Sequence, residues 1–439
     1  MSAATEQARL RRDIGWNLVP VLLLACVGLG LNFLIGRWWD EAALGTFNLV
    51  TIALFTFAVL GAGGIQYAVL RAVAEAAGHR ADSAEAAAAE ADADADRIAT
   101  IVVGALIPGL ALAAAATALY VALHRPVGDL LGSEAVATGM LWSAPALFCF
   151  AVNKLLLGVV NGLRRMRAFA VYTSLRYLLI GGGLLIARSW HLEAAQLPVI
   201  WTFAEGVLLL VLIVELLATV RLARGRAGWT SWARRHIAFG ARGVIATLAY
   251  EINTKLDVWM LGIALPEAQV GIYSLAAALN EGAMQLSVVL QNNTNPVIAR
   301  HLASDQGAEV VALVRRVRRW FVPAMVGLCA LGAALYPAVI PWLVGKPSFA
   351  GGAVPFAIMM VGLALASPYL PFAQILLMGS LPGWHTVYVL GIVAVNLTCN
   401  LVLIPMFGLT GAALSIAASM VSAAVLLRVL LRRHLGLRL

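Results

Sequence analysis

The segment DEAALGTFNLV at residues 40–50 returns later in the chain as PEAQVGIYSLA at residues 266–276. A second pair of similar segments, RRDIGW at residues 11–16 and RRHIAF at residues 234–239, lies upstream in the same order. Two matches in the same order indicate an internal duplication, with a division near residue 225. The first pair of segments corresponds, at a constant offset of 226 residues, at Glu41 and Glu267, Ala42 and Ala268, Gly45 and Gly271, Phe47 and Tyr273, and Leu49 and Leu275.

The composition of the 439-residue chain is that of a membrane protein. Hydrophobic residues make up 62% and charged residues 12% of the chain, whereas soluble proteins average about 45–50% and about 25%. With a mean hydropathy of +0.88, the chain has too little polar surface to cover a water-soluble particle. The net charge of +9 lies in short loops beside apolar segments, so we expect no nucleic-acid partner.

Twelve apolar segments are long enough to cross a bilayer as helices, which requires about 20 residues each. Six lie on each side of residue 225, which predicts an all-α polytopic fold of two six-helix bundles at residues 1–225 and 226–439. Because six is an even number, both bundles have the same orientation, and we expect an axis along the membrane normal and a central cavity between them. The predicted spans are 15–36, 43–70, 98–122, 135–159, 168–187, 197–219, 238–263, 271–298, 320–344, 353–379, 385–406 and 409–431.

The loops predict the orientation of these spans, since cytoplasmic loops carry an excess of arginine and lysine. With the N-terminus inside, the inner segments hold 23 arginines and the outer segments hold three arginines and one lysine. Both termini should therefore lie in the cytoplasm. The longest outer loop, residues 123–134, is too short for an extracytoplasmic domain. The longest inner loop, residues 72–97, is rich in alanine and acids, and we interpret it as a solvated helical extension, with partner binding as the alternative.

The motifs of enzymes and ATP-driven pumps are missing from the sequence. There is no GxxxxGKS/T phosphate loop, no HExxH and no CxxC pattern. The four cysteines lie in apolar stretches, as small buried hydrophobic residues do. We therefore expect no catalytic residue, no metal site and no cofactor. Transport would use an ion gradient or the membrane potential, or would run downhill.

Eight ionisable residues inside the predicted spans are the main candidates for function, because a charge in hydrocarbon must face protein or water. Their charges sum to zero, so a structural network of ion pairs is one interpretation. The other is a central site in which the cations bind an anionic substrate and the acids carry a coupling ion or balance the cations. The cations are Arg176, Lys255, Lys154 and Arg242, and the acids are Asp257, Glu281, Glu251 and Glu205.

Depth in the membrane distinguishes these residues. Lys154 and Arg242 lie near the inner ends of their spans and could extend to the interface. Arg176 lies near the middle of its span among tyrosine, serine and threonine, where such an extension is hard. Arg176 is therefore the strongest candidate for contact with an anionic ligand.

The seventh and eighth predicted spans are the most polar. Glu251 and Lys255 are four residues apart and would form an ion pair on one helix face, which leaves Asp257 without a partner in its own helix. We expect both spans to line a wet cavity. The polar residues expected to line it are Asn253, Asn280, Gln285 and Asn292.

Six segments of the chain match a known family in order and spacing: LGTFNLV (44–50), GAGGIQYAVLRAVAE (61–75), NGLRRMRAFAVYTSLR (161–176), NTKLDVWMLGIALPEAQVGIYSLAAALNE (253–281), NPVIARHLASD (295–305) and NLVLIPMFGLTGAALS (400–415). They resemble the polysaccharide flippases of the Wzx type, within the superfamily of multidrug, oligosaccharidyl-lipid and polysaccharide exporters. The similarity covers nearly the whole chain, and no single motif is diagnostic.

This resemblance implies a flippase of the bacterial cytoplasmic (inner) membrane that acts in polysaccharide biosynthesis. The implied substrate is a polyprenyl-pyrophosphate-linked oligosaccharide, such as an O-antigen unit, moved from the cytoplasmic to the outer leaflet by alternating access. Lys255 and Asp257 match the family's basic-x-Asp pattern, and Arg176 fits its basic residue in the fifth span. The implied partners are this lipid-linked oligosaccharide, membrane lipid, H⁺ or Na⁺ as coupling ion, and glycan-assembly enzymes. We expect a monomer.

Other classes of function stay open. The intramembrane acids allow a cation-coupled multidrug or small-molecule exporter of the same superfamily. A lipid II flippase of that superfamily usually has more spans than this chain. A membrane glycan polymerase or ligase would need a large outer loop, which is missing, and a non-transporting scaffold in a glycan-assembly complex is a further alternative.

Overall fold

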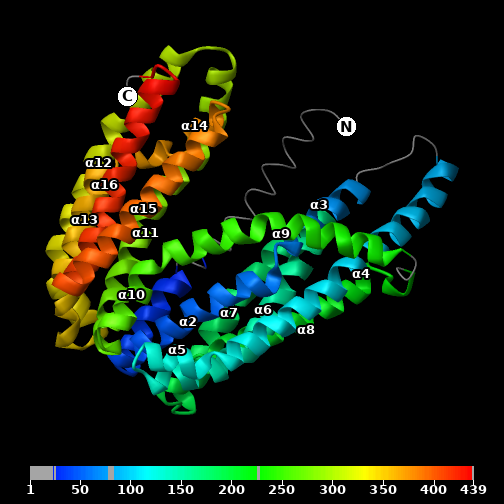
Figure 1. Ribbon diagram of the computed structural model, residues 1–439, viewed down its shortest axis with the longest axis horizontal. Coiled ribbons are helices and arrows are strands. Elements are labelled where there is room, and N and C mark those ends of the chain that lie inside the picture. Colours follow the sequence, from blue (N-terminus) through cyan, green and yellow to red (C-terminus); the bar gives the residue numbers. More distant parts are fainter. Residues whose placement is uncertain (1–22, 24–25, 78–83, 225–227, 438–439) are drawn as a thin grey trace. The chain divides into compact units, whose positions relative to one another are not determined.

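The computed structural model describes residues 23, 26–77, 84–224 and 228–437, and every regular element within these ranges is a helix (Figure 1). The predicted all-α fold is thereby confirmed for this part of the chain. The RRDIGW segment, the start of the first predicted span (residues 15–22, 24 and 25) and residues 78–83 of the acidic loop lie outside the described residues.

The described chain divides into two compact units. The first contains Thr46–Ile252 and the described residues up to Leu31, and the second contains Asn32–Gly45 and the described residues from Asn253 onward. The predicted bundles at residues 1–225 and 226–439 are defined by counting spans along the chain. The two units are defined by contacts between residues, and their boundary falls inside α2 (Glu41–Ala62) and α9 (Trp229–Thr254). The division of the chain into two six-helix bundles therefore stays a prediction.

The helices have the following bounds. α2 (Glu41–Ala62) begins in the second unit and continues in the first. The first unit then contains α3 (Ile65–Ala77), α4 (Ala84–Ala122), α5 (His124–Leu130), α6 (Glu134–Gly162), α7 (Met166–Ser189), η1 (Ala194–Gln196), α8 (Val199–Thr219), η2 (Leu222–Arg224) and most of α9 (Trp229–Thr254). The second unit contains α10 (Leu256–Ala264), α11 (Glu267–Ala303), α12 (Gly307–Val344), η3 (Pro347–Gly352), α13 (Ala353–Ala366), η4 (Leu370–Phe372), α14 (Ile375–Met378), α15 (Pro382–Phe407) and α16 (Leu409–His434).

Within the described ranges, nine helices are long and apolar enough to cross a membrane. They correspond to the second to sixth and the ninth to twelfth predicted spans. The first predicted span lies partly outside the described residues, and its described part, residues 26–38, is helical. The seventh and eighth are helical as α9, α10 and α11, which are too short or too polar to count among the nine.

Besides residues 353–379, which form α13, η4 and α14, two predicted spans are interrupted in the structure. Residues 43–70 form α2 and α3, which are separated at Gly63 and Gly64, where φ is +54° and +72°. Glycine reaches such angles without steric cost, so this pair explains the break. Residues 238–263 form α9 and α10, which are separated at Lys255. This second break falls on a predicted functional cation.

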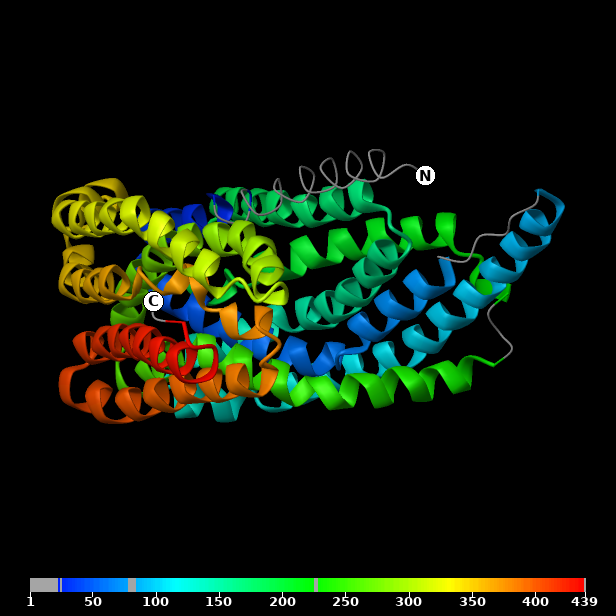
Figure 2. The ribbon, with the colours of Figure 1, turned by 90° about the horizontal axis from the view of Figure 1, so that it is seen from above.

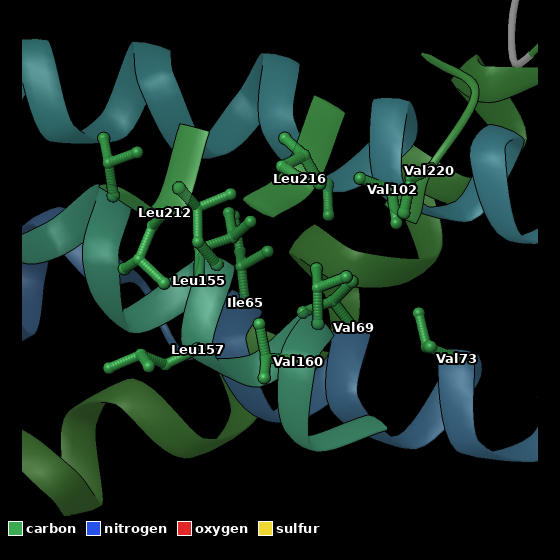
Figure 3. Close-up of a cluster of buried hydrophobic side chains, with 14 of the residues drawn as sticks. Ile65, Val69, Val73, Val102, Leu155, Leu157, Val160, Leu212, Leu216 and Val220 are labelled. Atoms are coloured by element: carbon green, nitrogen blue, oxygen red, sulfur yellow. The ribbon is translucent and has the colours of Figure 1, made fainter. Parts of the chain in front are cut away.

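The core of the first unit surrounds α6, which packs against α3, α4 and α8. Figure 3 shows side chains of these helices converging, and Ile65, Leu155 and Leu212 are at most 4% exposed. Alanines such as Ala105 and Ala151 belong to the same buried cluster. Small residues let helices approach closely, which matters in lipid because packing drives helix association there.

The second unit is built on pairs of neighbouring helices. α16 packs against both α13 and α15, and Figure 2 shows α15 and α16 side by side in orange and red. Gly408 is the single residue between them. The predicted separation of the last two spans at this glycine is confirmed.

The outside of the described helices carries large apolar side chains, as expected for a surface in contact with lipid. Leu210, Val214 and Leu217 of α8 are between 64% and 67% exposed. Trp190 and Trp342, near the ends of α7 and α12, are 73% and 77% exposed. Tryptophan is enriched at the two faces of a membrane, so these residues have the position expected of interface anchors.

The two copies of the repeated segment touch one another within the second unit, at the start of α2 and the start of α11. A Cβ atom added at Gly45 would overlap the carbonyl oxygen of Glu267, and one added at Gly271 would overlap the carbonyl oxygen of Glu41. The contact is therefore reciprocal, because each glycine lies against the first turn of the matching copy. We call these four residues the glycine clasp.

We expect Gly271→Ala to lower the thermal stability of the purified protein, because the added Cβ atom cannot fit without separating the starts of α2 and α11. Overpacking of this kind usually costs about 1–3 kcal/mol. Gly327→Ala in α12 is the matched control, since its Cβ would meet no atom within 4 Å and alanine suits a helix better than glycine by about 1 kcal/mol. Thermal unfolding in detergent compares the two variants, and equal midpoints would contradict the glycine clasp.

Candidate functional site

Arg176 of α7 and Glu205 of α8 form an ion pair inside the first unit. The Nε atom of Arg176 lies 2.7 Å from Oε1 of Glu205, and its Nη2 atom lies 3.2 Å from Oε2. The Nη2 contact is a hydrogen bond, whereas the Nε contact is an ion pair without hydrogen-bond geometry. The Glu205 side chain is fully buried and that of Arg176 is 11% exposed, so each charge depends on the other for compensation.

Asn153 of α6 holds the same acid. Its Nδ2 atom donates to Oε2 of Glu205 at 2.8 Å and to the backbone carbonyl of Glu205 at 2.9 Å. Asn153 is fully buried. Our sequence analysis missed Asn153 because it considered only ionisable residues. An amide beside Lys154 in an apolar span was the signal that could have found it.

Phe150 lies one helical turn before Lys154 and contacts two cations. The Nζ atom of Lys154 and the Cζ atom of Arg176 each lie 4.8 Å from the centroid of its ring. Such contacts contribute about 0.5–1 kcal/mol at exposed sites and about 2 kcal/mol when they are desolvated. The Lys154 ammonium also interacts electrostatically with Glu251 and Glu205. Four of the eight predicted ionisable residues therefore form one cluster in the first unit.

A second cluster lies between α10 and α11 in the second unit. Lys255, at the N-cap of α10, forms an ion pair with Glu281 of α11. Asp257, in the first turn of α10, is 6% exposed and accepts a hydrogen bond of 2.6 Å from the hydroxyl group of Tyr273. Tyr273 is fully buried. A carboxylate in the first turn of a helix also interacts favourably with the helix dipole.

The break between α9 and α10 corrects one expectation from the sequence. Glu251 lies in α9 and Lys255 follows the end of that helix. The two residues therefore do not lie on one continuous helix, and the pairing of Glu251 with Lys255 stays a prediction. Lys255 meets Glu281 in the second unit, whereas Glu251 interacts with Lys154 in the first.

The remaining predicted site residues lie on α9 and α11 and differ in exposure. Asn253 is in the last turn of α9, and Arg242 lies on the same helix with an exposed side chain. On α11, Asn280 is 2% exposed, whereas Gln285 and Asn292 are exposed. That these five residues line a common cavity stays a prediction.

A third polar group lies near the ends of α7 and α8 and was missed from the sequence. Arg165, which caps α7, forms an ion pair with Glu215 of α8, whose side chain is 11% exposed. The Tyr172 hydroxyl donates to the same carboxylate at 2.8 Å. Glu215 lies inside the predicted span 197–219, and this position was the signal that could have added it to the intramembrane acids.

Comparison with known families identifies one match. The family model described as polysaccharide biosynthesis protein matches residues 10–301. A comparison with curated protein sequences gave no match. In the part of the chain that the structure describes, no group of three or more histidine, cysteine, aspartate or glutamate residues could hold a metal ion.

Several solved structures share the fold. An inward-facing multidrug resistance transporter of the MATE family, in the MOP superfamily, has a TM-score of 0.75 and 14% identity, over 97% of this chain and 98% of its own. The lipid II flippase MurJ in an inward closed conformation has a TM-score of 0.71 and 12% identity, over 95% of this chain and 87% of its own. A MOP superfamily transporter from Pyrococcus furiosus has a TM-score of 0.62 and 12% identity, over 97% and 95%. At such identities the likeness concerns the fold alone.

We expect Glu205→Gln to destabilise the protein more than the double variant Arg176→Gln, Glu205→Gln. Removal of one partner leaves the other as an uncompensated buried charge, which costs about 3–5 kcal/mol, whereas loss of both leaves neutral amides. Thermal unfolding of the wild type, both single variants and the double variant gives the coupling energy of the pair.

The exposed pair Arg71–Glu75 of α3 is the matched control for this cycle. Its side chains are 69% and 57% exposed, so the same substitutions there should give a coupling energy of only about 0.3–0.5 kcal/mol. Additive effects of Arg176→Gln and Glu205→Gln would contradict the assignment of a buried ion pair.

Proposed function

The chain belongs to the family of polysaccharide biosynthesis proteins, and on this basis we propose that it is a flippase for an oligosaccharide linked to polyprenyl pyrophosphate. The lipid-linked sugar, of which an O-antigen unit is an example, would move from the cytoplasmic to the outer leaflet of the bacterial inner membrane by alternating access. The likeness of the fold to MOP-superfamily transporters, one of them a lipid II flippase, supports a transporter of this kind.

The observation that carries the proposal is the pair of cations at Phe150. A pyrophosphate group bears at least two negative charges and needs cations along its path. Arg176 uses its Nε and Nη2 atoms for Glu205, and its guanidinium still has donors on Nη1 for a phosphate oxygen. Lys154 adds a point charge on a flexible stem beside the same ring.

Glu205 and Asn153 have a positioning role in this proposal. Their bonds hold the guanidinium of Arg176 in one orientation, which lowers the entropic cost of binding an anion. The acid also makes the empty cluster stable without substrate. Without this acid, the charge of Arg176 would be uncompensated in the membrane, which costs free energy.

The cluster in the second unit would couple transport to an ion gradient. Asp257 is a buried carboxylate whose hydrogen-bond donor, the Tyr273 hydroxyl, is neutral. A proton or Na⁺ would neutralise the acid, and Glu281 beside Lys255 offers a second carboxylate for exchange. Arg242, together with the polar residues of α9 and α11, would complete the lining of the transport path.

We propose the following membrane orientation, oligomeric state and partners. Both termini would lie in the cytoplasm, the protein would work as a monomer, and no cofactor would be needed. The acidic inner loop at residues 72–97 would be available to glycan-assembly enzymes.

We expect Lys154→Gln to slow flipping about tenfold or more without loss of folded protein, because one cation is removed from the phosphate path. The measurement uses vesicles that contain the protein and a polyprenyl-pyrophosphate-oligosaccharide labelled on the sugar. An impermeant glycan-cleaving enzyme then reports the sugar that reaches the outside. Arg188→Gln, a neutralisation of an exposed arginine on α7, is the control and should flip at the wild-type rate.

Normal flipping by Lys154→Gln would remove this cation from the mechanism. If the wild type does not flip the lipid-linked sugar but transports a drug-like cation in the same vesicles, the protein is a multidrug exporter and not a flippase. The exporter is the second candidate because the buried acids Glu205 and Asp257 could bind a cationic substrate or a coupling ion.

We expect Asp257→Asn to fold but to lose the dependence of transport on an imposed ion gradient. The amide oxygen of asparagine can still accept the hydrogen bond from Tyr273, whereas it cannot be protonated near neutral pH. Glu215→Gln is the matched control, since Glu215 is an intramembrane acid outside this cluster, and it should keep the gradient dependence. Failure of Asp257→Asn to accumulate in the membrane would indicate a structural role for the acid.

A further inference from the structure

Four arginines line one groove of the second unit. The groove has a volume of about 730 Å³ and runs along α12 beside Pro368, which follows α13. Its other lining residues are small or apolar. The arginines are Arg315, Arg316, Arg318 and Arg319. None of the four has a carboxylate within ion-pair distance in the part of the chain that the structure describes, which distinguishes them from the paired cations of the candidate site.

Arg318 is fixed in this groove with one donor unused. Its Nε atom donates to the carbonyl oxygen of Pro368 at 2.6 Å, and its guanidinium lies 4.2 Å from the centroid of the Tyr369 ring. Its Nη2 atom is buried and has no hydrogen-bond partner among the described residues. Arg428 of α16 adds a further positive charge that acts on Arg318. A fixed, buried donor among like charges favours an anion as its missing partner.

The groove lies where lipid phosphates are found. α12 has 38 residues, about 57 Å of helix, whereas the hydrocarbon layer is only about 30 Å thick. The charged first part of α12 must therefore extend beyond that layer. Trp320 directly follows the arginines and is 56% exposed, as expected for a residue at the membrane interface. The excess of arginine assigns this end of α12 to the cytoplasmic side.

A separate apolar groove lies on another face of the same helix. It has a volume of about 390 Å³ and lies between α11 and α12. The apolar groove is therefore not part of the basic groove. The apolar groove is lined by Leu286, Val289, Leu290, Asn293, Trp320, Phe321, Ala324, Met325 and Leu328.

We propose that the groove on α12 binds the phosphate group of an anionic lipid in the cytoplasmic leaflet. Arg318 supplies the fixed donor, and Arg315 and Arg319 lie on the same face of α12 to contact the other phosphate oxygens. The inference does not depend on the substrate proposed above. It requires only that the cytoplasmic end of α12 faces the lipid headgroups.

The test measures lipid binding to the purified full-length protein in detergent, by native mass spectrometry with phosphatidylglycerol as probe. Arg315→Gln and Arg318→Gln should each weaken binding about tenfold, as expected for one charge-assisted contact. Arg188→Gln on α7 removes the same charge elsewhere and should bind as the wild type does. Arg315 is exposed, and substitutions at exposed positions usually change stability little, so it keeps the test valid if Arg318→Gln fails to fold.

Three results distinguish the possible ligands. The proposal is supported if Arg315→Gln and Arg318→Gln bind phosphatidylglycerol more weakly and Arg188→Gln does not. If the same two variants also bind a polyprenyl pyrophosphate more weakly, the proposal extends to that lipid. Equal affinities of the groove variants and the wild type overturn it. Inorganic pyrophosphate that binds as tightly as the lipids, with the same dependence on Arg318, also overturns it in favour of a site for free phosphate.

Discussion

The cost of a charge without compensation inside a membrane governs both clusters of this protein. Glu205 receives donors from α6 and α7, and Asp257 receives one from α11, so each buried acid joins its own helix to another helix. The same requirement gives the break at Lys255 a physical meaning. Lys255 lies at the N-cap of α10, between α9 and α10, and forms an ion pair with Glu281 of α11. The contacts that compensate these charges therefore also hold neighbouring helices together.

The glycine clasp expresses a second constraint, the distance of closest approach between helices. Two helix starts can lie backbone to backbone only if the residues between them have no side chain. Gly45 and Gly271 meet this condition reciprocally, and they are the matching positions of an internal duplication. A duplicated sequence has thus become a nearly symmetrical contact, in which a change in one copy acts on the other.

The cations of this protein fall into two kinds with different surroundings. Arg176 and Lys255 each form an ion pair with an acid on another helix. The arginines of α12 have no such acids in the described part of the chain, which would be tolerable at the membrane interface proposed for them. Paired cations suit a site that must remain stable when it is empty, and unpaired cations suit a surface that is always in contact with anions.

The sequence by itself determined the helical class and located most of the apolar helices, because the length of an apolar segment is a local property of a chain. It also identified most of the ionisable residues that form the clusters. Only the tertiary structure decided which charges meet. Lys255 binds an acid 26 residues away, and Asn153 binds an acid 52 residues away. Such pairs depend on which helices pack together and where a helix breaks, and neither follows from the spacing of residues along one segment.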